Sequence, residues 1–412
     1  MGSITEKAEV FPNVPADVAP DIMWDLKIRL TADKTPGKVD LGAGVYKDEE
    51  GKYYELPVIH KAKKILAAQP VDHNYGFNTG DPAFLKKAAE VIFGKDSEVL
   101  RAEKVASIQT IAGTGACHLG AVFSSHFFRP DPSAPPPSAY VGAPAWPNYE
   151  PLFTYTQLAP TFYPHYDYAT KHVAFDSLLQ AAADAPPRSV FVLQAVCHNP
   201  TGRDLSRAQW VQVAEALEAK GHLPFFDIAY QGFGAGLEED AWPIREFVRR
   251  GLQVVVAQSF SKNLGLYGER VGVLHVVAGS KEVAVRAGDQ LRSFARWTWA
   301  SPPRYAATLA KIVMEEFWDE WLDNLRVMRE RLQKNRKNLH WWLTEELKTP
   351  GNWDHILEET GLFSLLALTP AQVERMASED HIHFPTTGRI NVAGLTETNV
   401  ETLARSVDKV VR

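Results

Sequence analysis

The chain has 412 residues, and its 44 lysine and arginine side chains against 50 aspartate and glutamate side chains give a formal net charge of −6. This mildly acidic net charge does not indicate a basic surface for binding nucleic acid or an anionic membrane. Hydrophobic residues make up 45% and charged residues 23%, which is typical of a globular protein, and no apolar run reaches the ~20 residues of a membrane helix.

The N-terminal segment MGSITEKAEVF has no apolar stretch of the kind found in a secretory signal. The two cysteines, Cys117 and Cys197, are too few for a disulfide framework and fit a reducing compartment. We therefore expect an intracellular, cytoplasmic protein.

Four short apolar runs recur in the middle of the chain, at residues 189–196, 223–230, 252–260 and 270–277. They show no polar alternation, which is typical of strands buried on both faces of a parallel sheet. Residues 205–221 carry apolar side chains at helical spacing between the first two runs, with a Ser–Gln capping box ahead of them. This order predicts an α/β fold in which helices cover a mostly parallel sheet.

Residues 305–347 form one long helical pattern that ends before Pro350 and Gly351. Such a length exceeds a typical globular helix, so the segment is expected to bend, break or bridge two domains. The tail mixes short strands with a closing helix. We predict a large domain at 52–318 and a smaller α+β domain, made of 1–51 with 319–412, across a cleft.

The segment QSFSKNLGLYGERVG (258–272) places Lys262 directly after a buried strand, at the edge where open α/β sheets bind ligands. A lysine with a depressed pKa at that position can form a Schiff base with a carbonyl. Ser259, Ser261 and Arg270 supply groups able to hold a phosphate. A lone lysine in a polar loop is more often a surface residue, so the interpretation depends on the whole string.

Two further strand ends carry polar residues. FFDIAYQGF (225–233) ends a buried strand with Asp227, and a buried carboxylate needs a partner to offset its desolvation. CHNPTG (197–202) runs from a strand into a turn. Its Cys197 and His198 suggest metal binding, but no second Cys/His pair has ligand spacing, so no metal is expected.

These strings resemble the aspartate aminotransferases, which are pyridoxal-phosphate enzymes of the class I aminotransferase type. The resemblance covers nearly the whole chain and includes separated motifs in the expected order. It implies the fold of the pyridoxal-phosphate-dependent transferases, with pyridoxal 5′-phosphate (PLP) as cofactor.

The resemblance assigns roles around the cofactor ring. Lys262 would be the Schiff-base lysine and would carry the proton between the substrate Cα and the cofactor's C4′. Asp227 would pair with the pyridine nitrogen, while Tyr230 and Asn199 would bind the phenolic oxygen. Trp146, in PAWPNY (144–149), would stack on the ring.

The phosphate would be held by residues of three segments. QTIAGTGA (109–116) is a glycine-rich turn leading into a helix, where free N–H groups attract anions. The expected ligands are Gly113, Thr114, Ser259 and Arg270, together with Tyr75 from a second subunit.

Substrate selection would depend on two arginines. Arg389, in TGRINVAGL (387–395), matches the residue that binds the substrate α-carboxylate through two parallel hydrogen bonds from its guanidinium. Arg296, in FARWTWASPP (294–303), matches an arginine of the neighbouring subunit that binds the side-chain carboxylate of the substrate. Arg292 and Arg304 are the alternative candidates for that role. The remaining substrate contacts implied by the resemblance are Gly44, Trp146 and Asn199.

The sequence departs from the family at several places. Ala112 replaces a phosphate-binding serine, and Pro147 replaces a glycine beside the stacking indole. Tyr149 replaces a histidine that supports the aspartate, with a hydroxyl still able to donate to Asp227. Ala300–Ser301 replaces a Ser–Asn pair, and His383 lies where another aromatic residue is common.

The sequence thus predicts ping-pong transamination, L-aspartate with 2-oxoglutarate giving oxaloacetate and L-glutamate, in a homodimer with shared sites and no nucleic-acid or membrane partner. One alternative is a PLP-dependent lyase or racemase acting on an acidic amino acid. Another is an aminotransferase shifted to aromatic substrates, since Trp297 and Trp299 flank Arg296. A non-catalytic PLP-binding protein is a third.

Overall fold

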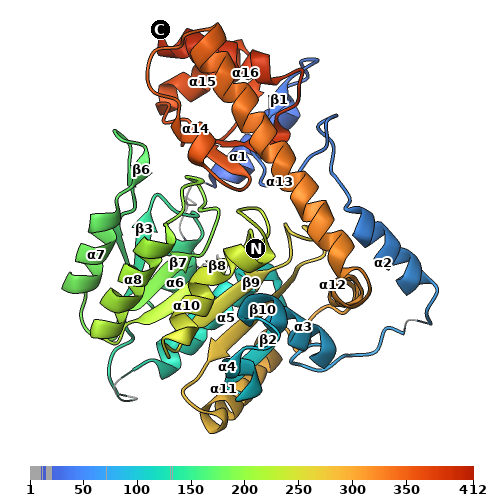
Figure 1. Ribbon diagram of the computed structural model, residues 1–412, viewed down its shortest axis with the longest axis vertical. Coiled ribbons are helices and arrows are strands. Elements are labelled where there is room, and N and C mark those ends of the chain that lie inside the picture. Colours follow the sequence, from blue (N-terminus) through green and yellow to red (C-terminus); the bar gives the residue numbers. More distant parts are fainter. Residues whose placement is uncertain (1–10, 12, 15–20, 71, 130, 132) are drawn as a thin grey trace, which may run out of the picture.

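The computed structural model describes residues 11, 13–14, 21–70, 72–129, 131 and 133–412. The residues on which the secretory-signal expectation depends lie almost entirely outside this part of the chain. Figure 1 shows a wide lower part built around a sheet and a smaller upper lobe, joined by one long diagonal helix.

The lower part is organised by a seven-stranded sheet in the order β2-β10-β9-β8-β7-β3-β4. The β4–β3–β7–β8–β9 portion is parallel throughout, whereas β10 pairs antiparallel with both β9 and β2. The predicted mostly parallel sheet is thereby confirmed. The strands are β2 Val105–Ile111, β3 Ala139–Ala143, β4 Pro160–Pro164, β7 Val190–Gln194, β8 Leu223–Ile228, β9 Val255–Ser259 and β10 Val271–Val277.

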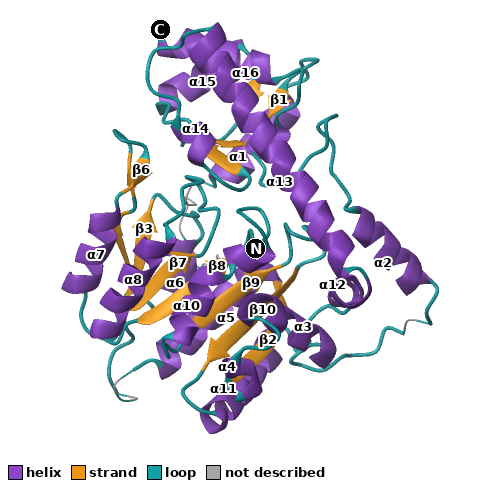
Figure 2. Ribbon diagram, in the orientation of Figure 1, coloured by secondary structure: helices purple, strands orange, loops and turns teal. Residues whose placement is uncertain are grey.

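Successive residues of a strand point to opposite faces of the sheet, and here both faces are covered by helices (Figure 2). In β8, Phe225 packs edge-to-face on Phe153 with ring centroids 5.8 Å apart, while Phe226 packs on Trp210 at 5.8 Å. This burial on both faces explains why the strand sequences are continuous apolar runs.

The helices of the lower part are α2 Pro57–Ala67, α3 Pro82–Phe93, α4 Glu98–Arg101, α5 Ala112–Phe127, α6 Tyr149–Tyr155, α7 Phe175–Asp184, α8 Arg207–Ala219, α9 Leu237–Asp240, α10 Trp242–Arg249 and α11 Lys281–Thr298.

The β7–α8–β8 unit begins its helix as the sequence predicts. The Ser206 side chain accepts from the backbone of Gln209, and the Gln209 side chain accepts from the backbone of Ser206, which completes a capping box. Gly221, just beyond the helix, takes a φ of +62°, a conformation that glycine adopts at little cost.

The long helical pattern at 305–347 is interrupted in the structure. It breaks at Phe317, which leaves the helical region with φ −132° and separates α12 (Tyr305–Glu316) from α13 (Trp318–Trp341). The Phe317 ring packs against the core, and the Nζ of Lys61 lies 5.5 Å from its centroid. A five-residue π-helical turn, Trp342–Glu346, follows α13.

Helix α13 bridges the two parts of the molecule, as Figure 1 shows. Near its start, the Trp321 indole N–H donates to the Asn263 carbonyl oxygen at 2.7 Å, in the loop after β9. Further along, the buried Asn335 amide donates to the Val392 and Leu395 carbonyl oxygens. One helix thus fixes the loop after β9 relative to the C-terminal segment.

The upper lobe combines both ends of the chain. Strand β1 (Val39–Asp40) pairs in parallel with β12 (Ile382–His383), and β11 (Phe363–Leu365) pairs antiparallel with β13 (Arg389–Asn391). The predicted domain boundaries at residues 52 and 318 stay a prediction.

The other elements of the upper lobe are the helices α1 Ile22–Ala32, α14 His355–Glu358, α15 Pro370–Glu379 and α16 Val400–Val411, together with the 3₁₀ turn Val392–Gly394. The lower part also contains a small hairpin of β5 (Tyr166–Asp167) and β6 (His172–Val173).

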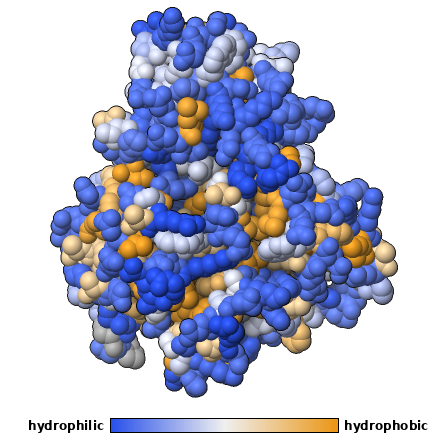
Figure 3. Space-filling model, in the orientation of Figure 1, coloured by the Kyte–Doolittle hydropathy of each residue, from blue (hydrophilic) through white to orange (hydrophobic). Residues whose placement is uncertain are grey.

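The surface in Figure 3 is mostly hydrophilic, with apolar side chains gathering where the upper lobe meets the lower part. Among the helices that the structure describes, none is long and apolar enough to cross a membrane.

The packing of α13 predicts a large stability difference between two leucines on one helix. Leu325 is 1% exposed and fits against Gly232, where an added Cβ would lie 2.8 Å from the Leu325 Cδ1. Leu325→Ala is expected to lower the free energy of unfolding by about 2–5 kcal/mol, because it leaves a cavity. Leu322, which is 36% exposed, is the control, and Leu322→Ala should lower it by less than about 1 kcal/mol. Urea denaturation of both variants measures the difference, and equal losses would contradict the packing described here.

Candidate active site

The candidate site is a cavity at the carboxyl ends of the parallel strands, where open α/β sheets bind ligands. It encloses about 460 Å³ of space that opens to solvent. Most of the residues singled out in the sequence meet there. The lining residues are Ala112, Gly113, Thr114, Trp146, Gln194, Asn199, Asp227, Ala229, Tyr230, Ser259, Ser261, Lys262 and Arg270.

Lys262 lies on the turn that follows β9, and it is half-buried. Its Nζ is 5.1 Å from the centroid of the Tyr230 ring. Burial lowers the pKa of the Lys262 amine, while the charge of Asp227 raises it and that of Arg270 lowers it again. The lower pKa increases the fraction of unprotonated amine, which is the nucleophilic and basic form.

Asp227, on the buried strand β8, uses its two carboxylate oxygens differently. Oδ2 accepts a 2.7 Å hydrogen bond from the Tyr149 hydroxyl, whereas Oδ1 is buried without a hydrogen-bond partner among the described residues. Burial raises the pKa of this carboxyl, and the Tyr149 hydroxyl, the Lys262 charge and the Cys117 thiol lower it. Since a buried carboxylate oxygen without a donor is costly, Oδ1 is suited to a donor supplied by a ligand.

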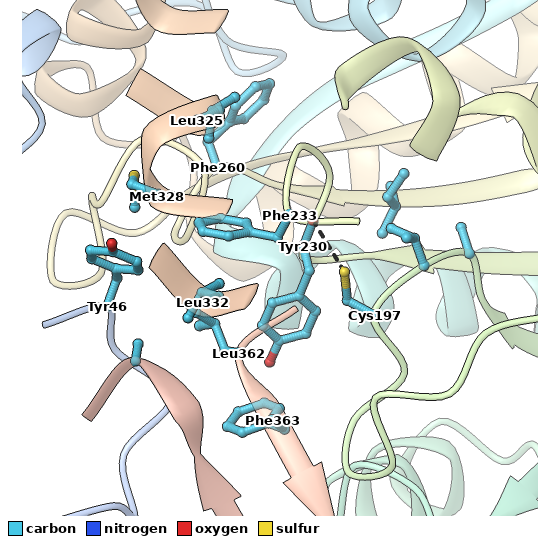
Figure 4. Packing of buried hydrophobic residues seen from close by; sticks show 14 of the residues in the cluster. Tyr46, Cys197, Tyr230, Phe233, Phe260, Leu325, Met328, Leu332, Leu362 and Phe363 are labelled. Carbon is cyan, nitrogen blue, oxygen red and sulfur yellow. Dashed lines mark hydrogen bonds between the residues drawn. The ribbon is translucent and has the colours of Figure 1, made fainter. Parts of the chain in front are cut away.

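Tyr230 and Asn199 lie on the other side of the cavity. In Figure 4 the Tyr230 ring points toward Phe363 of the upper lobe, and the ring centroids are 5.8 Å apart. The Cys197 Sγ contacts the Tyr230 carbonyl oxygen at 3.9 Å. Asn199 is fixed through its backbone, which donates to Gln194 Oε1 at 2.8 Å and accepts from Gln194 Nε2 at 3.0 Å.

An anion cradle forms where α5 begins. The free N–H groups of the first turn of this 16-residue helix attract negative charge. Gly113 packs so closely here that an added Cβ would lie 2.8 Å from the Ser259 Cβ. The half-buried Arg270 guanidinium is held by the Tyr267 carbonyl oxygen at 3.0 Å. Ala112 and Arg270 both take left-handed φ values, 58° and 54°, which are uncommon for residues with a Cβ.

Arg389 brings a third cationic side chain to the site, this one from the upper lobe. Its Nη2 donates to the Gly42 carbonyl oxygen at 2.7 Å, its Nη1 to Asn199 Oδ1 at 3.3 Å, and its guanidinium carbon lies 4.2 Å from the Phe363 ring centroid. Its Nε is buried without a partner among the described residues. Gly44 lies against the same ring, and a Cβ there would be 2.8 Å from the Phe363 Cζ.

Four residues predicted for the site do not line this cavity in the single chain. Gly44 and Arg389 lie beside it in the upper lobe, whereas Tyr75 is 92% exposed and Arg296 lies on the exposed last turn of α11. The competitors of Arg296 are both in ion pairs, Arg292 with Asp289 and Arg304 with Asp72.

Sequence reasoning missed three contributors, of which Gln194 is the clearest. It ends β7 directly opposite Asp227 in the parallel register. A polar residue at the end of a buried apolar strand was the available signal. Phe363 and Met23, whose Sδ lies 3.5 Å from Arg389 Nη2, carried no comparable signal because they are apolar. Among the described residues, no cluster of His, Cys, Asp and Glu side chains could hold a metal ion.

Comparison with known proteins agrees with this geometry. The chain is 38% identical over 396 residues to the cytoplasmic aspartate aminotransferase of Schizosaccharomyces pombe, covering 95% of this chain and 96% of that one. The solved cytoplasmic aspartate aminotransferase of Saccharomyces cerevisiae superimposes with a TM-score of 0.93 at 37% identity, covering 98% of both chains. The aromatic-amino-acid aminotransferase of Burkholderia pseudomallei, solved with covalently bound pyridoxal phosphate, gives 0.93 at 35% identity, covering 98% of this chain and 100% of that one.

The family model for aminotransferase class I and II matches residues 36–407, which includes both the sheet and the upper lobe. The match therefore spans the cavity, Lys262 and Arg389 together. The chain belongs to the class I and II aminotransferases.

Proposed function

We propose that this protein transfers the amino group of L-aspartate to 2-oxoglutarate, giving oxaloacetate and L-glutamate, with PLP as cofactor and a ping-pong order. The observation that carries the proposal is the placement of an amine with a lowered pKa, Lys262, and a buried carboxylate oxygen without a donor, Asp227 Oδ1, in one cavity. Asp227 Oδ1 needs a donor that the described residues do not supply.

PLP fits these residues by charge and by hydrogen bonding. When bound, it supplies an aldehyde carbon that takes up the amino group and an electron-accepting ring. The Asp227 Oδ1 would accept from the ring nitrogen, Trp146 would cover the ring, and Tyr230 and Asn199 would donate to the phenolic oxygen. Asp227 would keep the ring nitrogen protonated, because the negative charge of its carboxylate favours the cation.

The α5 cradle would hold the phosphate. Gly113 and Thr114 offer backbone N–H groups at a helix N-terminus, and Ser259 and Arg270 add a hydroxyl and a guanidinium. The close approach of Gly113 to Ser259 leaves no room for a side chain, so the backbone itself forms this wall of the cradle.

Lys262 performs the proton transfers. Its half-buried amine, with a lowered pKa, would take the proton from the substrate Cα and deliver it to C4′. Arg389 orients the substrate for this step by binding the α-carboxylate through its guanidinium, with Asn199 and the backbone at Gly44 beside it. Asn199 already contacts Arg389 at 3.3 Å, so the two act on one carboxylate.

We further infer that the working form is a homodimer in the cytoplasm, with each site completed by the other subunit. Exposure of Tyr75, Arg296 and Trp297 on the single chain supports this inference, since Trp297 is 75% exposed beside Arg296. Arg296 of the second subunit would bind the side-chain carboxylate of aspartate or glutamate, and Tyr75 would contact the phosphate.

A second candidate is transamination of aromatic amino acids. The two tryptophans that follow Arg296 support it, because the exposed Trp297 and the part-buried Trp299 offer apolar surface to an aromatic side chain. A lyase or racemase would use the same Lys262 and Asp227, and it differs by its products: it leaves no stoichiometric amino form of the cofactor.

Lys262→Ala is expected to lower kcat with aspartate and 2-oxoglutarate by at least about 10³-fold, because it removes the group that moves the Cα proton. The rate of oxaloacetate formation measures this loss. Lys281→Ala, which changes a lysine on the solvent-exposed start of α11, is the control and should leave kcat unchanged. Retention of more than a tenth of the activity in Lys262→Ala would contradict the proposed role.

Arg296→Ala should lower kcat/KM for L-aspartate by about 10²-fold but change that for L-phenylalanine by less than about threefold, because only aspartate presents a second carboxylate. Arg292→Ala, on the same helix, is the matched control and should change neither value. Steady-state kinetics with both amino acids checks this. If Arg292→Ala instead produces the selective loss, the assignment of Arg296 is wrong.

A further inference from the structure

We propose that Gln194 is a positioning residue of the active site: its amide clamps the backbone of Asn199 and thereby holds the Asn199 side chain between Arg389 and the phenolic oxygen of PLP. This inference rests on the proposed function and extends it to a residue outside the predicted cofactor and substrate contacts.

The Gln194 side chain spans the turn that carries Asn199. Gln194 is the last residue of β7 and so extends from the parallel sheet. Its Oε1 accepts from the Asn199 backbone N–H at 2.8 Å, and its Nε2 donates to the Asn199 carbonyl oxygen at 3.0 Å. Because the amide is planar and carries an acceptor beside a donor, these two bonds fix the direction of both Asn199 backbone groups.

Among the described residues, Gln194 is the only hydrogen-bond partner of the Asn199 backbone. The two preceding residues are held separately, because Asp204 accepts from the N–H of Cys197 at 2.9 Å and from that of His198 at 3.1 Å. Asn199 is 6% exposed, so loss of the Gln194 amide would leave two backbone groups without a partner and away from water. Such groups are costly, and the turn would move to satisfy them.

The Asn199 side chain is in turn oriented by Arg389. A guanidinium only donates hydrogen bonds, so the Nη1 of Arg389, 3.3 Å away, must face Asn199 Oδ1. This leaves the Nδ2 of Asn199, which has no partner among the described residues, as a donor at the wall of the cavity. At 3.3 Å the bond to Arg389 is at the long end of the usual range, so a small shift of the Asn199 backbone would break it.

Strand pairing places this clamp relative to Asp227. Gln194 lies directly opposite Asp227 in the parallel register of β7 and β8, and both residues line the cavity. Asp227 would contact the ring nitrogen of PLP, whereas the clamped Asn199 would contact its phenolic oxygen. The register of two buried strands therefore sets the separation between two contacts of the cofactor.

The test follows the absorbance of the PLP-loaded protein as a function of pH. A donor to the phenolic oxygen draws negative charge away from it, which makes the nitrogen that joins Lys262 to the cofactor less basic, because the two atoms share one proton. Gln194→Met keeps the length of the side chain but removes both hydrogen bonds. It should shift the midpoint of the absorbance change upward by about 0.5 pH units or more.

A double-mutant cycle determines whether Gln194 acts through Asn199. In an Asn199→Ala background, adding Gln194→Met should move the midpoint by less than about 0.2 pH units, because the side chain that it positions is absent. Gln194→Asn keeps the amide but is one methylene shorter, so it should behave like Gln194→Met, and it stands in if Gln194→Met does not fold. Gln180→Met is the control and should leave the midpoint unchanged, because Gln180 is an exposed residue of α7 that bonds Asp184 in its own helix.

Each outcome discriminates. A shift of the same size with and without the Asn199 side chain would mean that Gln194 acts on the cofactor directly. An unchanged midpoint in Gln194→Met, or a wild-type midpoint in Gln194→Asn, would mean that the clamp does not position Asn199. Any of these results overturns the inference, whereas a wild-type protein that shows no absorbance from bound PLP would instead overturn the proposed cofactor.

Discussion

The structure depends on a buried carboxylate and a half-buried amine of opposite charge at one sheet edge. Asp227 lies on β8 and Lys262 follows β9, the neighbouring strand, and burial shifts the pKa of each toward its neutral form. A core built only for stability would avoid such groups, because each one costs free energy unless it has a partner. Here the partner of Asp227 Oδ1 is left to a ligand, and the fold around it maintains that arrangement.

The surrounding elements each secure one part of this edge. Helix α5 supplies the anion cradle, α6 carries Tyr149 beneath Asp227, and α13 fixes the loop after Lys262 through the bond from Trp321 to Asn263. The same α13 holds the C-terminal segment that carries Arg389. The position of the Lys262 amine relative to the Arg389 guanidinium is therefore fixed through one continuous helix.

Much of the sheet could be predicted because strands buried on both faces are apolar at every position, as Phe225 and Phe226 illustrate. The direction of β10 could not, since an antiparallel strand buried on both faces has the same pattern. A break in the long helix was among the expected outcomes, but its position at Phe317 was not predictable, because the Phe317 ring packs on the core and no local breaker such as proline marks the site. In the site, Lys262 and Asp227 were predictable from strand ends, whereas the position of Gln194 opposite Asp227 required the register. The hydrogen bond of Tyr149 was foreseen as an option, and the structure confirms the contact.

The most direct test is to locate the lysine that holds PLP. Borohydride reduction fixes the cofactor covalently to that residue, and peptide mass spectrometry identifies it. The account predicts a single adduct at Lys262, lost when L-aspartate is added before the reductant, because the substrate amine then replaces the lysine. An adduct at another lysine, or one at Lys262 that aspartate does not affect, would contradict it.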